Sequence, residues 1–150
     1  MSRILCLDLG ERRTGVAISD ETRTIAQSLT TISHKTDKEL ITAIQHLSNN
    51  YHVGKIVIGL PLSLSGKPST RSEKIRQFAH KLSANLALPV ELFDERFSTT
   101  RAQEIYTEVT GRRFRPTNNR RRTATHPIDR IAATVILENY LAQLNNRHES

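Results

Sequence analysis

Cysteine is almost absent: the 150-residue sequence contains a single cysteine, at position 6. A single cysteine excludes an internal disulfide and a zinc site built from cysteines. The six histidines show no metal-ligand spacing, and we predict that they lie at the surface. No apolar run approaches the ~20 residues that a membrane-spanning helix requires. These absences favour a protein of the reducing cytoplasm that has no membrane partner.

Aromatic residues are scarce as well, at 5% of the chain with no tryptophan, and acids are outnumbered. The 22 lysines and arginines exceed the 15 acids and give a formal net charge of +7. Such a balance favours a polyanionic partner such as nucleic acid, although a basic surface can also serve solubility alone. With few aromatic rings for base stacking, contact with the phosphate backbone is the better expectation.

The hydrophobic pattern predicts one α/β domain over residues 1–150, with a flexible tail at 144–150. Strands are expected at 3–9, 14–19, 27–32, 55–61 and 88–96, and helices from 36 and at 70–86, 99–110 and 127–144. Because a hairpin-led meander precedes alternating helices and strands, we predict a mixed five-stranded sheet with helices on both faces. Residues 111–127 are predicted to be a basic, proline-containing loop.

Acids stand at the ends of predicted strands. Asp8 ends an apolar strand, where burying an isolated carboxylate would cost several kcal/mol. Asp94 and Glu95 end the fifth strand, and Asp129 falls in the first turn of the last helix. Since parallel strands end at one edge of a sheet, these acids could meet there around Mg²⁺ or Mn²⁺, which would relieve their mutual repulsion. Alternatively, Asp94 forms a turn, Glu95 pairs with Arg96, and Asp129 only caps its helix.

Four blocks of the chain together form a specific pattern: CLDLGERRTGVAISD, KIVIGLPLSLSG, VELFDERFST and PIDRIAATVILENYL. In these blocks, which span nearly the whole chain, the sequence resembles the YqgF family, described as pre-16S rRNA nucleases and as Holliday junction resolvases. The resemblance implies a ribonuclease H-like fold and metal-dependent phosphodiester hydrolysis. It places the family's catalytic, metal-binding acids on Asp8, Glu95 and Asp129, with Asp94 as a further candidate ligand. The sequence departs from the family in carrying Thr-Ala-Thr-His-Pro between its basic run and its last helix.

The segment ahead of the last helix is rich in arginine. We predict that nucleic acid is bound by Arg112, Arg113, Arg115, Arg120, Arg121 and Arg122. The planar guanidinium fork matches phosphate oxygens, although a charged run of this kind can also be a merely solvated loop.

The sequence therefore predicts a cytoplasmic, metal-dependent nuclease of ribosome biogenesis that processes the 5′ end of pre-16S rRNA. One alternative is a Holliday junction resolvase acting on branched DNA in recombination and repair. More remote is an RNA-binding module without catalysis. Asp8-Leu9-Gly10 with Thr14-Gly15 also resembles the first phosphate motif of actin-like ATPases, but those proteins need two such domains. A monomer is favoured and a dimer stays open, because only the last helix carries surplus apolar surface.

Overall fold

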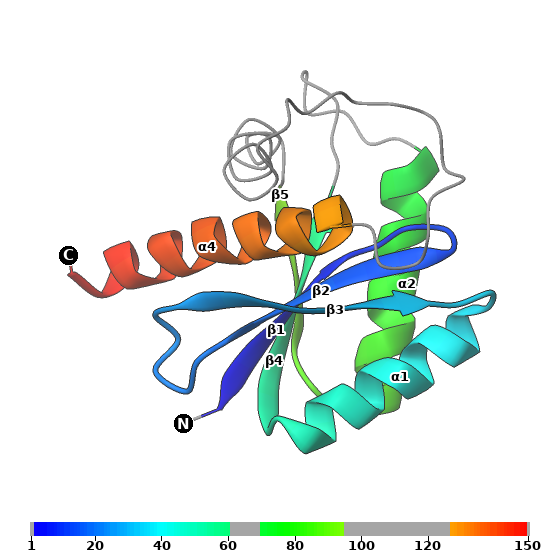
Figure 1. Cartoon of the computed structure of the whole chain (residues 1–150), viewed down its shortest axis with the longest axis horizontal. Coiled ribbons are helices and arrows are strands. Elements are labelled where there is room, and N and C mark those ends of the chain that lie inside the picture. The colour runs from blue at the N-terminus through cyan, green and yellow to red at the C-terminus, as the bar shows by residue number, and fades with distance from the viewer. Residues whose placement is uncertain (1, 61–69, 95–126, 150) are drawn as a thin grey trace.

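The computed structural model describes residues 2–94, except 61–69, together with the last helix, residues 127–149 (Figure 1). The elements, in chain order, are β1 (Arg3–Asp8), β2 (Arg13–Ser19), β3 (Ala26–Ser33), α1 (Asp37–Asn50), β4 (Val53–Leu60), α2 (Thr70–Leu86), β5 (Val90–Asp94) and α4 (Pro127–Glu149). The predicted helix at 99–110 and the predicted loop at 111–127 fall outside the described residues, apart from Pro127, which begins α4.

The five strands form one sheet in the order β3-β2-β1-β4-β5. β1 pairs with β2, and β2 with β3, in antiparallel fashion, whereas β1, β4 and β5 run parallel. Three strands therefore end at one edge of the sheet, with Asp8, Leu60 and Asp94, and we call it the carboxyl edge. β3 ends there too, because two antiparallel pairings restore the direction of β1. The predicted mixed sheet is confirmed.

Helices cover both faces of the sheet and bury its side chains in two separate cores. Side chains of α1 and α2 pack with Leu5 and Leu7 on one face, and α4 packs with Ile4 and Cys6 on the other. Successive side chains of a strand point to opposite faces, so covering both faces explains why β1 is apolar at consecutive positions. Each fully buried aliphatic side chain contributes about 1.5–3 kcal/mol. The prediction of helices on both faces is confirmed.

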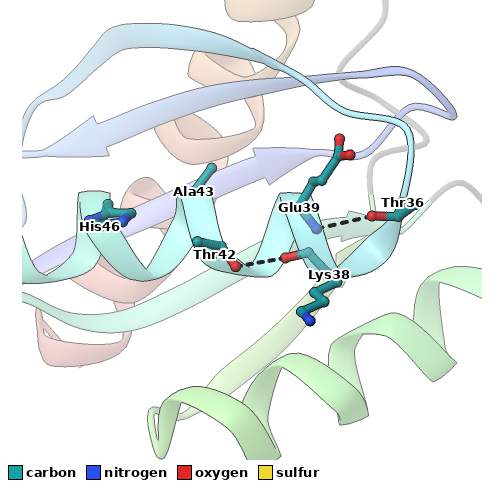
Figure 2. A pocket seen from close by; sticks show the side chains of 6 residues that line it. All are labelled: Thr36, Lys38, Glu39, Thr42, Ala43 and His46. Carbon is teal, nitrogen blue, oxygen red and sulfur yellow. Dashed lines mark hydrogen bonds between the residues drawn. The ribbon is translucent and has the colours of Figure 1, made fainter.

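Helix α1 begins at a capping box. The Oγ1 atom of Thr36 accepts a hydrogen bond from the backbone N–H of Glu39 at 3.2 Å, as Figure 2 shows. In return, the Glu39 carboxylate accepts from the backbone N–H of Lys35 at 2.9 Å, one residue earlier than the usual reciprocal bond. The first bond satisfies an amide that the helix leaves free, and the second ties the residue before the cap to the first turn. Together they set the point at which β3 turns into α1.

Helix α4 extends to Glu149, beyond the predicted helix end near residue 144. Its last residues are polar, so no apolar periodicity indicated that the backbone stays helical there. The flexibility of 144–150 and the assignment of 1–150 to one domain stay predictions. Within the described residues, no helix has the length and apolar character needed to cross a membrane.

Candidate functional site at the carboxyl edge

Asp8 is the last residue of β1 and lies half-buried at the carboxyl edge. It alternates with Ile4 and Cys6, which belong to the core under α4, so its side chain is on the α4 face of the sheet. Its register partner in β2 is Gly15, which has no side chain to crowd the carboxylate. The edge where parallel strands end is where open α/β sheets bind ligands, and Asp8 is therefore the centre of the candidate site.

Asp94 ends β5 at the same edge but on the other face. Its register partner is Leu60, which packs in the core under α1 and α2. Phe93, the residue before it, packs on the α4 face, as the alternation of a strand requires. The structure therefore brings Asp8 and Asp94 to one edge without placing their side chains on one face.

Of the other predicted site residues, Asp129 lies in the first turn of α4. Glu95 and the arginines Arg112, Arg113, Arg115, Arg120, Arg121 and Arg122 fall outside the described residues. In the part of the chain that the structure describes, no three His, Cys, Asp or Glu side chains gather closely enough to hold a metal ion. Asp8 offers a hard carboxylate oxygen on the α4 face of this edge, and such an oxygen suits Mg²⁺ or Mn²⁺.

The turn after Asp8 is held by groups from distant parts of the chain. A Cβ atom at Gly10 would lie 2.2 Å from the carbonyl oxygen of Arg13, so only glycine fits this close approach. From α2, Arg71 Nη2 donates to the carbonyl oxygen of Leu9 at 2.9 Å. From the end of β3, the backbone N–H of His34 donates to the carbonyl oxygen of Arg12 at 2.9 Å. The backbone that carries Asp8 is thus tied to two other elements.

His34 is buried beside this turn, and the prediction that all histidines lie at the surface is wrong for it. His34 is only 7% exposed, and the Nε2 atom of its ring lies 2.9 Å from Oγ1 of the fully buried Thr14. Burial lowers the pKa of His34 because it disfavours the charged ring, while the nearby carboxylates of Asp37 and Glu39 oppose this shift. The position of His34 between a strand and a capping box was the available signal, since that junction must pack against the sheet.

A shallow hollow lies on the outer side of α1, with a volume of about 550 Å³. Its described lining, drawn in Figure 2, comprises Thr36, Lys38, Glu39, Thr42, Ala43 and His46. Because α1 covers the face opposite to Asp8, the hollow is not part of the candidate site.

The arrangement of strands and helices matches solved ribonuclease H-like resolvases. The yeast mitochondrial Holliday junction resolvase Ydc2 aligns with a TM-score of 0.58 at 15% identity, covering 99% of this chain and 82% of that protein. RuvC of T. thermophilus, in complex with a Holliday junction substrate, aligns with a TM-score of 0.55 at 10% identity over 96% of both chains. The fold is therefore ribonuclease H-like.

Sequence comparison narrows this class to a family. The model of the RuvX family, described as a Holliday junction resolvase, matches residues 2–143. A relative from Syntrophus aciditrophicus is 42% identical over 93% of this chain and 87% of its own length. One from Thermoanaerobacter pseudethanolicus is 37% identical over 97% and 99%. Both are named "Putative pre-16S rRNA nuclease". The chain belongs to the RuvX family, which confirms the resemblance to YqgF proteins and the prediction of a nuclease.

Proposed function

We propose that this nuclease hydrolyses phosphodiester bonds at the 5′ end of pre-16S rRNA during ribosome biogenesis in the cytoplasm. The proposal rests on two relatives that match nearly the whole chain at 37% and 42% identity and are named for that substrate. The solved Holliday junction resolvases are only 10% and 15% identical, a level at which one fold hosts different substrates. The basic net charge of +7 agrees with a nucleic-acid substrate of either kind.

We propose Asp8, Glu95 and Asp129 as the catalytic acids and as ligands of a divalent metal, Mg²⁺ or Mn²⁺. When bound, such an ion would activate water and stabilise the negative charge that develops on the phosphate. Asp94 is the weaker candidate, because strand pairing directs it to the face opposite to Asp8. Asp8 itself would hold its carboxylate toward the α4 face, in an orientation set by the turn that follows.

The arginines ahead of α4 are proposed to hold the phosphate backbone. Replacing Arg120, Arg121 and Arg122 by glutamine should weaken binding of all sequences alike. The log–log dependence of affinity on salt should become shallower by ~0.7–0.9 for each lost phosphate contact. Filter binding at several salt concentrations measures this slope, and an unchanged slope would make the arginine run a merely solvated segment.

A side-by-side cleavage assay tests the substrate. Purified protein with Mg²⁺ or Mn²⁺ is given precursor 16S rRNA carrying its 5′ extension and, separately, a four-way DNA junction, with Asp8→Asn as the inactive control. We expect cleavage of the RNA by the wild-type protein alone. Symmetric nicks in the junction without RNA cleavage would show that the protein is a Holliday junction resolvase instead. Binding of RNA without cleavage of either substrate would favour a module without catalysis.

The alternative function, junction resolution, is favoured by the description of the family as Holliday junction resolvases. Paired cuts on opposed strands call for two active sites, which a symmetric dimer provides. Trimming one RNA end needs a single site, and we propose a functional monomer. Light scattering of the purified protein, read together with the cleavage assay, separates the two functions, because a stable dimer is expected only of the resolvase.

A further inference from the structure

Arg71 connects α2 to the backbone of the candidate site. It is the second residue of α2, and its Nη2 donates to the carbonyl oxygen of Leu9 at 2.9 Å, across 62 positions of the sequence. The bond is partly shielded from water, and a hydrogen bond from a charged donor is stronger than one between neutral groups. It is therefore a tertiary anchor, because it joins a helix to a strand end far away in sequence.

The anchored carbonyl is one peptide away from Asp8. Leu9 follows the last residue of β1, and its side chain is buried in the core under α1 and α2. Gly10 then folds closely over the backbone of Arg13. The buried side chain of Leu9 and its anchored carbonyl together restrict the rotation of the backbone that directs the carboxylate of Asp8.

We propose that Arg71 is a positioning residue of the nuclease site: by holding the carbonyl of Leu9, its guanidinium fixes the direction of Asp8. The expected effect of Arg71 on cleavage rests on the proposed nuclease function, whereas the anchoring of the turn by Arg71 does not. A misplacement of about 1 Å can cost a rate on the order of 100-fold, so one anchor is enough to matter.

Arg76 provides a matched control on the same helix. It is exposed, and its guanidinium lies 3.9 Å from the carboxylate of Glu73 one turn away. Replacing Arg71 or Arg76 by glutamine removes the same charge from α2, but only Arg71→Gln removes the bond to Leu9. A general effect of charge would appear in both variants, and positioning only in one.

Two measurements are made on Arg71→Gln, Arg71→Lys, Arg76→Gln and the wild type: hydrogen exchange of the amides of residues 10–13, and kcat and KM for the cleaved RNA. In Arg71→Gln we expect faster exchange in this segment and a kcat lowered ~10- to 100-fold with little change in KM. Arg71→Lys, which keeps one charged donor, should recover part of both, and Arg76→Gln should match the wild type.

Three results would overturn the proposal. Unchanged exchange with a raised KM and a shallower salt dependence would show that Arg71 contacts the phosphate. Faster exchange with unchanged kcat would show that the anchor does not limit catalysis. Equal effects in Arg76→Gln would point to charge alone. If the wild type cleaves no substrate, the proposed function fails separately, and exchange in the two glutamine variants still decides whether Arg71 anchors the turn.

Discussion

The two turns of the β1-β2-β3 meander differ in the contacts that hold them. The β2–β3 turn is held by its own residue Asp20, whose carboxylate accepts from the backbone N–H groups of Thr24 at 2.8 Å and Ile25 at 3.0 Å, and from the hydroxyl of Thr22. These bonds lower the pKa of Asp20 to about 2, and the bond from the backbone N–H of Ile25 has the largest effect. All partners of Asp20 lie within five positions. The turn has longer-range contacts as well, because Arg23 donates to the carbonyl oxygen and to the hydroxyl of Ser2, each at 2.9 Å.

The β1–β2 turn takes its partners from far along the chain. Arg71 and His34 bond to its carbonyls, and Gly10 allows its close backbone contact. Its geometry therefore depends on how α2 and the end of β3 pack against the sheet. The candidate acid Asp8 stands beside this turn, and the comparison teaches that a site needing fixed geometry is built where tertiary contacts over-determine the backbone.

The largest effect is expected for the acid beside the β1–β2 turn. Asp8→Asn removes the proposed charged ligand and should lower cleavage roughly 100-fold or more, since losing even an outer-shell partner of a metal costs 10- to 100-fold. Thermal unfolding and RNA affinity should change little, because the side chain keeps its size. Full activity of Asp8→Asn in the cleavage assay would remove the acid from the mechanism.

The next effect is expected for the glycine of the same turn. Gly10→Ala places a Cβ against backbone, 2.2 Å from the carbonyl oxygen of Arg13, and should lower both stability, by about 1–3 kcal/mol, and cleavage. Gly54→Ala is the control for cleavage, because its Cβ would clash with the Oγ of Ser2 at 1.9 Å and the Cβ of Ser2 at 2.5 Å, at the end of β4 that lies far from Asp8. Urea unfolding measures the stability of the two variants, and the cleavage assay measures their activity. Equal losses of cleavage would mean that the close approach at Gly10 is not special to the candidate site.

A pH effect is expected from His34 at the β1–β2 turn. Because burial lowers the pKa of His34 in the folded protein, the unfolded chain binds its proton first, and stability should fall as the pH drops below about 6.5. His34→Gln should flatten this part of the profile. Replacing the exposed His46 should leave it unchanged. Urea unfolding at several pH values between 7.5 and 5 measures it, and parallel profiles for the wild type and His34→Gln would contradict the assignment.

The smallest effect is expected at the β2–β3 turn. Asp20→Ala should lower stability modestly and leave cleavage unchanged, because this turn lies at the opposite edge of the sheet from Asp8. Since the folded pKa of Asp20 is about 2, the deficit of the variant should be present above pH 3.8 and fade as the pH falls toward 2. Chemical unfolding across this range follows it. A loss of cleavage in Asp20→Ala would erase the contrast between the two turns.

The sequence by itself determined the local structure and the class of protein. Alternation and apolar runs predicted the five strands, and Thr36 with Glu39 marked the start of α1. An acid at the end of an apolar strand made Asp8 a candidate site residue, which stays a prediction. Four sequence blocks indicated the family that comparison then confirmed. These features are readable because periodicity, caps and motifs involve residues that are neighbours in the chain.

Only the tertiary structure decided which distant groups meet. Strand register put Asp8 and Asp94 on opposite faces of the sheet. Packing buried His34 against Thr14 and brought Arg71 to the carbonyl of Leu9. No local pattern encodes such pairs, because a bond across 62 positions forms only after the helix has docked on the sheet and closed the loop between them.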